Sequence, residues 1–122
     1  FGSPGFVAAT RDGRVLLGQR SDRVSDSGWW DVFGGGVEPG ELPRDAATRE
    51  LAEEAGIRWA DVSARPIKIQ RSYAIYLGEV PVEVETRINW ESSDARWFDP
   101  GRLPARVLPR AVAAVREVRS WR

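Results

Sequence analysis

The sequence predicts an α/β protein in which helices cover a mixed β-sheet. Its 122 residues match the size of one compact domain. Apolar runs that are typical of strands come first, a helix-like segment follows, and further strands and a second helix end the chain. This order of elements is typical of a sheet with helices packed on it.

A hairpin and a short strand are predicted for the first third of the chain. Strands are expected over 6–10 and 15–20, because the dipeptide Asp12-Gly13 between two apolar runs is a strong hairpin signal. A short apolar segment over 29–33 predicts a further strand. The glycine run after it leaves the backbone free to approach a ligand closely.

A helix is predicted over 43–55. Pro43 suits the first turn of a helix, and Gly56 suits the left-handed residue that commonly follows the last turn. Leu42 falls at the N-cap, where Ser, Thr or Asp would be more usual.

Strands and a second helix are predicted for the rest of the chain. β-branched and aromatic residues favour strands over 67–71, 73–77 and 80–86, with a further short strand over 96–98. An amphipathic helix is expected over 109–121, where apolar residues form one stripe and arginines lie elsewhere.

Composition restricts the chemistry that the protein can perform. The sequence has no Cys and no His, which excludes disulfides, thiolate nucleophiles, histidine bases and zinc–thiolate sites. The 18 basic and 18 acidic side chains give a formal net charge of zero, which argues against bulk nucleic acid or an anionic membrane as partner. Any bound metal must have oxygen ligands, which favours a hard cation.

The densest chemical signal lies over 35–57. Six carboxylates and two arginines give this segment a charge of −4 (2 minus 6) within a neutral protein. Glu50, Glu53 and Glu54 stand at i, i+3 and i+4, so one helix face carries three like charges that destabilise it. A bound divalent cation would relieve this repulsion. For an isolated pattern of this kind, a solvated acidic face is the simpler interpretation.

The surroundings of this acidic face favour a ligand. A glycine-rich turn leads into the helix, so the backbone and the helix N-terminus can face a phosphate. Arg49 can pair with Glu41 or Glu50 and fix their orientation. Together these features predict a site for a phosphorylated ligand.

The same segment resembles the signature of a known family, the Nudix box G-x5-E-x7-R-E-U-x-E-E-x-G-U, in which U is aliphatic. All nine defined positions match, namely Gly35, Glu41, Arg49, Glu50, Leu51, Glu53, Glu54, Gly56 and Ile57. The hairpin before the box and the strand and helix after it are also similar to the Nudix family, so the resemblance covers 6–122.

The resemblance implies an α/β/α sandwich with a mixed sheet. It also implies hydrolysis of a nucleoside diphosphate linked to another group, with Mg²⁺ or Mn²⁺ as cofactor. The implied metal ligands are Glu50, Glu53 and Glu54, with the backbone carbonyl of Gly34 or Gly35 as a further ligand.

The resemblance also implies supporting and catalytic roles. Glu41 and Arg49 resemble the pair that braces the loop against the helix. Glu54 or Glu53 is favoured as the base that accepts the proton of the attacking water. Glu91 is a further candidate for this role and for metal binding because it precedes a predicted strand, although an ordinary loop surface position is slightly favoured. The implied catalytic set is Glu41, Arg49, Glu50, Glu53 and Glu54.

One position departs from the family pattern. Many members carry Pro before the glycine pair, whereas this chain has Phe33 there and a third glycine after it. We expect a looser loop, which affects the substrate geometry and not the metal site.

Weaker signals predict the substrate-binding residues. Arg20 and Arg23 follow the second strand and can reach phosphates, although ordinary surface charge explains them equally well. Tyr73 lies 16 residues after the box, a spacing that the family associates with dinucleoside polyphosphate hydrolases. The loop residues predicted to face the substrate are Gly34, Gly35 and Gly36.

These observations predict a metal-dependent MutT-like enzyme that acts on a nucleoside triphosphate or a similar small diphosphate. Dinucleoside polyphosphates and nucleotide sugars are alternative substrates. A non-catalytic Nudix module that binds a nucleotide or a partner protein is the alternative from another class, and the intact glutamate triad disfavours it.

We interpret residues 1–5 as a possible tag or terminal remnant and 6–122 as one Nudix domain. No apolar stretch approaches the roughly 20 residues that span a bilayer, and no signal pattern is visible, so a cytoplasmic protein is expected. We expect no nucleic-acid or membrane partner, and either a monomer or a homodimer.

Overall fold

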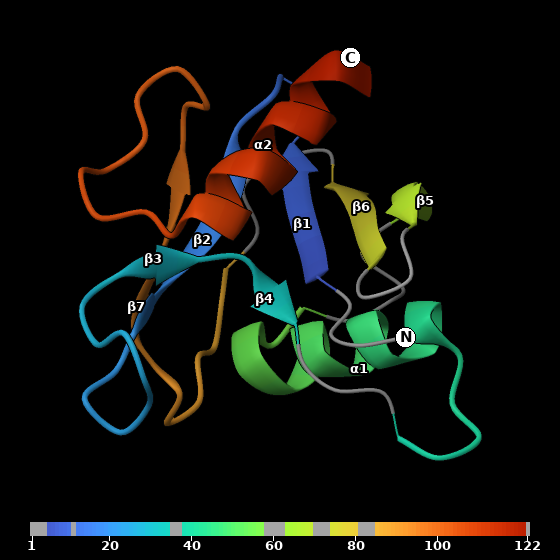
Figure 1. Cartoon of the computed structure of the whole chain (residues 1–122), viewed down its shortest axis with the longest axis horizontal. Helices are drawn as coiled ribbons and strands as arrows, with labels where there is room; N and C mark the ends of the chain where they lie inside the picture. Colours follow the sequence, from blue (N-terminus) through green and yellow to red (C-terminus); the bar gives the residue numbers. More distant parts are fainter. Residues whose placement is uncertain are drawn as a thin grey trace.

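A mixed sheet runs through the centre of the protein, with one helix on each side (Figure 1). The computed structural model describes residues 5–10, 12–34, 38–57, 63–69, 74–80 and 85–121. Its strands are β1 (Gly5–Thr10), β2 (Val15–Arg20), β3 (Trp30–Asp31), β4 (Phe33–Gly34), β5 (Ser63–Ile69), β6 (Ala74–Val80) and β7 (Ser92–Phe98). The helices are α1 (Pro43–Ala55) and α2 (Pro109–Trp121).

The sheet is mixed, as the sequence predicts. Its main path is β3-β2-β1-β6-β5, while β4 pairs with β1 and β7 pairs with β2. β1 and β6 are parallel, and the other pairs between these strands are antiparallel. α1 connects β4 on one side of β1 to β5 and β6 on its other side. A crossover of this kind allows β6 to lie parallel to β1 in the middle of the sheet.

The segment 30–34 separates the two strands of the first hairpin. β1 and β2 pair beside their turn, where Ala9 is opposite Val15. Further from the turn, β3 pairs with β2 and β4 pairs with β1. This insertion carries Gly34 to the side of the sheet on which α1 packs.

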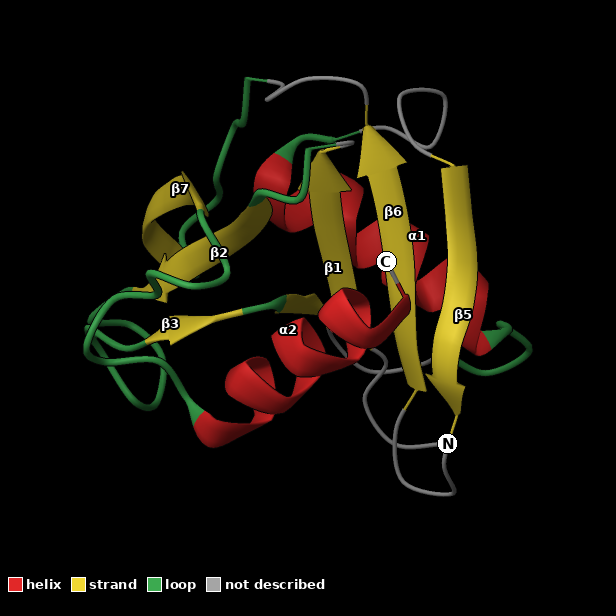
Figure 2. Cartoon of the chain, turned by 90° about the horizontal axis from the view of Figure 1, so that it is seen from above, coloured by secondary structure: helices red, strands yellow, loops and turns green. Residues whose placement is uncertain are grey.

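Apolar side chains form two cores on opposite faces of the sheet (Figure 2). Successive residues of β1 and β2 enter opposite cores, as the two-residue period of a strand requires. The core beneath α2 contains Val7, Ala9, Val15, Leu17, Trp30, Val107, Ala111, Ala114, Val115 and Val118. The core beneath α1 contains Ala8, Leu16, Phe33, Leu51, Ala55 and Ile57. These three layers confirm the predicted α/β/α sandwich.

Both helices begin and end at the predicted residues, but the strands between them differ from the prediction. Three strands are predicted over 67–71, 73–77 and 80–86, whereas the structure has β5 and β6. Residues 85–89 have no regular structure, and 81–84 lie outside the described residues. β6 lies between two strands in a sheet with helices on both faces, so alternating polarity does not mark its ends.

The ends of α1 confirm both sequence signals. The N-cap residue Leu42 makes no side-chain cap hydrogen bond. Gly56 adopts φ 71°, and its N–H donates to the carbonyl oxygen of Ala52 at 3.0 Å. A Cβ at position 56 would lie 2.8 Å from Cβ and 3.1 Å from the backbone N and O of Arg87. Glycine is therefore required both for the backbone conformation and for the approach of the later chain.

Among the described residues, no helix combines the length and the apolar character that crossing a bilayer demands.

We expect Gly56→Ala to lower the free energy of unfolding by about 2–3 kcal/mol, since it adds overpacking to the strain of a left-handed residue. Gly40→Ala is the matched control, because Gly40 has φ 79° and open space around its Cβ position. It should cost only about 1 kcal/mol. Urea unfolding of both variants measures the difference, and equal losses would contradict the role assigned to the contact with Arg87.

Candidate active site

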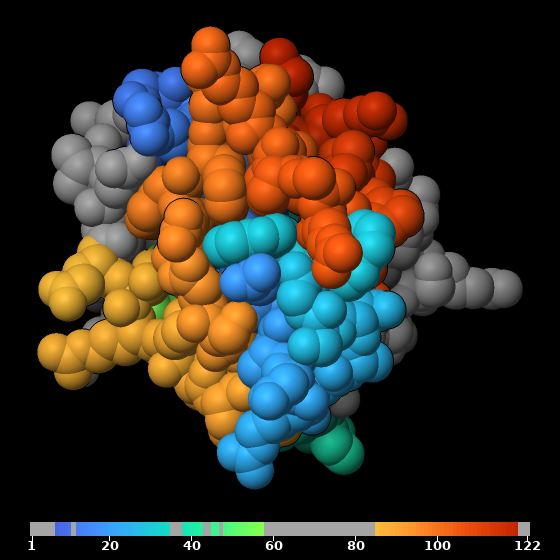
Figure 3. All heavy atoms as spheres, turned by 90° about the vertical axis from the view of Figure 1, so that its left-hand side faces the viewer, coloured from blue at the N-terminus to red at the C-terminus, as the bar shows by residue number. Residues whose placement is uncertain are grey.

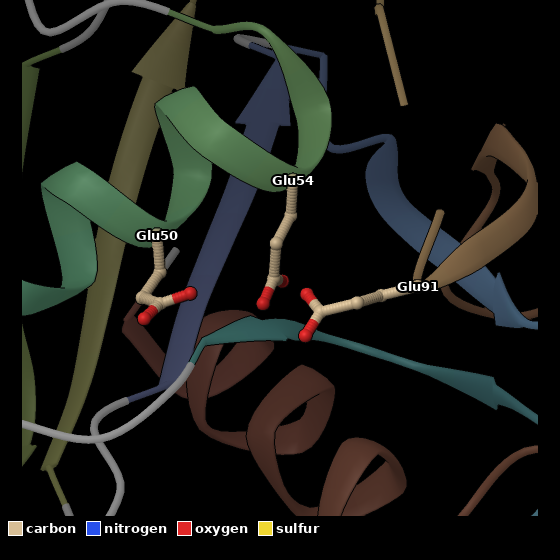
Figure 4. A group of neighbouring side chains, drawn as sticks. All are labelled: Glu50, Glu54 and Glu91. Carbon is tan, nitrogen blue, oxygen red and sulfur yellow. The ribbon is translucent and has the colours of Figure 1, made fainter. Parts of the chain in front are cut away.

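Three carboxylates from distant parts of the sequence converge beside the sheet. Glu50 and Glu54 extend from α1, and Glu91 extends from the segment before β7 (Figure 4). One carboxylate oxygen of each residue lies within 4.8 Å of the others. We call these three residues the carboxylate cluster.

The packing of α1 determines where its two cluster residues lie. Leu51 and Ala55 are 1% and 0% exposed and belong to the core beneath the helix. Glu50 and Glu54 are one turn apart, so their side chains share one face of α1. Because the neighbouring residues are anchored in the core, both carboxylates are held at the border between the helix and the sheet.

The segment 85–91 brings the third carboxylate to the C-terminus of α1. The N–H of Arg87 donates to the carbonyl oxygen of Ala55 at 2.8 Å, and the N–H of Asn89 donates to that of Glu54 at 3.3 Å. The last carbonyl groups of a helix have no partner within the helix, so this segment satisfies two of them. Glu91 follows two residues later and therefore reaches the cluster.

The end of β4 forms another wall of the site. The N–H of Gly34 donates to Oε2 of Glu54 at 3.3 Å. Phe33, in place of the proline common in the family, is 3% exposed and packs in the core beneath α1. A Cβ on Gly18 would lie 2.7 Å from Cζ of Phe33, so the missing side chain of Gly18 makes room for this ring. The expected looser loop after it lies over 35–37, outside the described residues.

Burial beside two other carboxyl groups changes the acidity of Glu54. Partial burial and the adjacent carboxylates of Glu91 and Glu50 raise the pKa of Glu54 to about 10, although the Gly34 N–H acts in the opposite direction. Clustered oxygen ligands with strong repulsion fit a hard divalent cation such as Mg²⁺ or Mn²⁺. The cluster residues would hold such a cation.

Arg49 joins the acidic residues around the cluster. Its Nε and Nη2 donate to the two carboxylate oxygens of Glu41 at 2.9 and 3.0 Å, and its Nη1 donates to Glu50 at 2.9 Å. These contacts raise the pKa of Arg49 and, through the same hydrogen bonds, lower the pKa of Glu41. Glu41 also accepts the N–H of Glu38 at 3.0 Å. Arg49 thus links the loop before α1 to the face of the helix that carries the cluster.

Glu53 lies apart from the carboxylate cluster. Its side chain is 55% exposed, and its Oε2 accepts a hydrogen bond from Arg49 at 3.4 Å. Residues 53 and 54 are separated by about 100° around the helix, and here the Glu53 side chain points to Arg49 and solvent. The structure therefore groups Glu50 and Glu54 with Glu91, while the predicted triad included Glu53.

The predicted substrate-binding arginines are engaged in the loop after β2. Arg20 donates to the carbonyl oxygen of Ser25 at 2.6 Å and to its Oγ at 3.1 Å, and it contacts Asp31 at 3.5 Å. The guanidinium of Arg23 lies over the ring of Trp90, 5.6 Å from its centroid. Three other predicted site residues, Gly35, Gly36 and Tyr73, lie outside the described residues.

The sequence interpretation missed a buried acidic residue, Asp31. Its side chain is 9% exposed and accepts hydrogen bonds from Arg110 at 2.6 and 3.1 Å, which raises the pKa of Arg110. This pair connects β3 to the start of α2. The signal was present in the sequence, because Asp31 is the one charged residue in the apolar segment 29–33.

An α/β/α sandwich with a glutamate-rich helix beside its sheet is the arrangement that the resemblance to the Nudix family implies. The family model for the NUDIX domain matches residues 3–121. This match confirms the resemblance, and the chain belongs to the Nudix family.

Individual relatives match this chain over shorter stretches. An RNA pyrophosphohydrolase of Sphingopyxis alaskensis is 42% identical over 77 residues, which are 63% of this chain and 45% of the relative. A CTP pyrophosphohydrolase of Escherichia coli is 51% identical over 47 residues, which are 38% of this chain and 35% of the relative. The matches thus span less than half of either relative.

A solved structure agrees with the fold over nearly the whole chain. The crystal structure of RenU, a Nudix hydrolase from M. smegmatis, superposes with a TM-score of 0.81 and 23% identity. The match covers 98% of this chain and 84% of that protein.

We expect Glu54→Gln to stabilise the metal-free protein. A carboxyl group with a raised pKa keeps its proton in the folded state but releases it above its ordinary value of 4.5 once unfolded, so stability falls as the pH rises from 4.5 towards 10. Glutamine does not ionise. In EDTA the variant should therefore have the higher Tm, by a margin that grows from pH 5 to pH 8.

Glu53→Gln is the matched control, because it removes one charge from the same turn outside the cluster. It should show no such margin. Equal melting temperatures for Glu54→Gln and the unmodified protein at pH 8 would contradict the repulsion described above.

The pairing of Glu41 with Arg49 predicts the opposite pH dependence. Because the pKa of Glu41 is lowered from 4.5, its pairing stabilises the fold above that pH and is lost as the pH falls further. Glu41→Gln should lower the Tm at pH 7, and the difference should shrink below pH 4.5. Glu38→Gln, at a side chain 67% exposed, should change little at either pH. Thermal unfolding at pH 7 and pH 3.5 tests this, and a difference that persists at pH 3.5 contradicts it.

Proposed function

We propose that the protein hydrolyses a phosphoanhydride bond of a nucleotide with the help of Mg²⁺ or Mn²⁺ held by Glu50, Glu54 and Glu91. The observation that carries the proposal is the convergence of these carboxylates from α1 and from the segment before β7. Membership of the Nudix family and relatives named pyrophosphohydrolases support it.

In this proposal the cation acts on the phosphate groups and the attacking water, and the protein side chains transfer the proton and hold the reacting groups in position. A bound divalent cation neutralises phosphate charge and increases the acidity of an attacking water. Glu54 accepts the proton of that water, a role supported by its position between Glu50 and Glu91 and by its ionisation once the cation is bound. Gly34 orients the carboxylate by donating its N–H to Oε2. Glu41 and Arg49 position Glu50 from the other side.

A nucleoside triphosphate that loses pyrophosphate is the favoured substrate. The relatives named for CTP and for RNA share one chemical description, pyrophosphohydrolysis. In this proposal Arg20 and Arg23 contact phosphate groups after exchanging their present partners, Ser25 and Trp90. Dinucleoside polyphosphates and nucleotide sugars remain alternative substrates.

A substrate panel tests the proposal directly. The panel contains the eight common nucleoside and deoxynucleoside triphosphates, a 5′-triphosphate RNA oligonucleotide, dinucleoside polyphosphates and nucleotide sugars, each with Mg²⁺ or Mn²⁺. Released pyrophosphate and mononucleotide are measured separately. We expect pyrophosphate from at least one triphosphate substrate and no turnover in EDTA.

Glu54→Gln should lower kcat by about 10²–10⁴-fold, because it removes the proton acceptor. Glu38→Gln is the control and should cost much less, because its side chain lies in the loop before α1 and is 67% exposed. Circular dichroism and Tm show whether each variant is folded. Full activity of folded Glu54→Gln would refute the assigned base. Absence of turnover across the whole panel, together with tight nucleotide binding, would favour the non-catalytic module.

A further inference from the structure

The backbone around Glu91 is held on both sides by residues outside the carboxylate cluster. The N–H of Glu91 donates to Oδ1 of Asn89 at 3.0 Å. Its carbonyl oxygen accepts the N–H of Ser21 at 2.9 Å. Both peptide groups of this residue are therefore fixed, although it lies in a segment without regular structure.

Ser21 anchors this segment to the end of β2. It is 7% exposed, and its hydroxyl donates to the carbonyl oxygen of Trp90 at 2.7 Å while it accepts the N–H of Arg23 at 3.3 Å. Figure 3 shows the loop after β2, in light blue, against the later segment, in orange. Ser21 thus binds two consecutive peptide groups of a segment that is 70 residues away in the sequence.

Asn89 connects the same segment to α1. Its side chain accepts the N–H of Glu91, while its own N–H donates to the carbonyl oxygen of Glu54 at 3.3 Å. One residue therefore contacts the backbones of two members of the carboxylate cluster. The spacing between the two carboxylates depends on this residue directly.

We propose that Ser21 and Asn89 are positioning residues that hold Glu91 against Glu50 and Glu54 and thereby set the affinity of the cluster for a divalent cation. The hydrogen bonds that Ser21 and Asn89 make to the backbone of residues 90 and 91 fix where the carboxylate of Glu91 lies. The inference rests on the proposed function, because it requires a cation at the cluster.

The test is calorimetric titration of the metal-free protein with Mn²⁺ alone, which needs neither substrate nor turnover. Asn89→Ala and Ser21→Ala should each weaken Mn²⁺ binding about tenfold, the lower end of the effect of residues that orient metal ligands. Asn89→Ser keeps an acceptor that can form the same local turn and should restore most of the affinity. Ser93→Ala is the matched control, because the Ser93 hydroxyl is exposed and, among the described residues, bonds to Gln19 alone.

A double-mutant cycle separates positioning from general loosening of the fold. If Asn89 acts through Glu91, then Asn89→Ala should have no further effect on Mn²⁺ affinity in a Glu91→Gln background. Should Ser21→Ala fail to fold, Asn89→Ala carries the test alone, since within the described part of the chain the half-buried Asn89 side chain makes one hydrogen bond, to the N–H of Glu91.

The outcomes distinguish this inference from the proposed function. Hydrolysis and Mn²⁺ binding that are unchanged in both alanine variants overturn the inference and leave the proposed function standing. Equal losses with and without Glu91 also overturn it, because they show an effect that does not pass through that residue. A folded wild-type protein that binds no Mn²⁺ overturns the proposed function and the inference together.

Discussion

Crowding of three carboxyl groups is the constraint around which the rest of this structure is arranged. One carboxylate oxygen of each of Glu50, Glu54 and Glu91 lies within 4.8 Å of the others, and burial beside the other two groups raises the pKa of Glu54. Ionising all three groups at once is unfavourable in the absence of a cation, because the charges repel one another. The neighbouring elements therefore hold them together: the core beneath α1, the N–H of Gly34 and the backbone contacts of Asn89.

The arginine nearest to the cluster leaves this repulsion largely in place. Arg49 directs its guanidinium to Glu41 and Glu50, on the side of α1 that faces the loop before it. Arg49 also forms ion pairs with the exposed carboxylates of Glu38 and Glu53, at 3.8 and 3.4 Å. Positive charge is thus supplied on the Glu50 side of the carboxylate cluster, while Glu54 and Glu91 lie further from Arg49.

The sequence predicts the part of the site that lies on one helix and fails where distant segments meet. The bounds of α1, the left-handed Gly56 and the shared face of Glu50 and Glu54 follow from local spacing and glycine chemistry. The proximity of Glu91 depends on a segment that caps the C-terminus of α1, and no local pattern encodes that contact. The lone charge of Asp31 in an apolar segment is a local signal, but its partner Arg110 is 79 residues away and no local pattern identifies it.

The zero net charge of the chain conceals a spatial separation of charge. The segment 35–57 carries −4, whereas 100–122 carries six arginines and one glutamate, a balance of +5 (6 minus 1). α1 and α2 belong to these two segments and lie on opposite faces of the sheet (Figure 2). Arg110 pairs with Asp31 on its own side. Because the sheet keeps the basic helix away from the cluster, the field there stays negative and attracts cations.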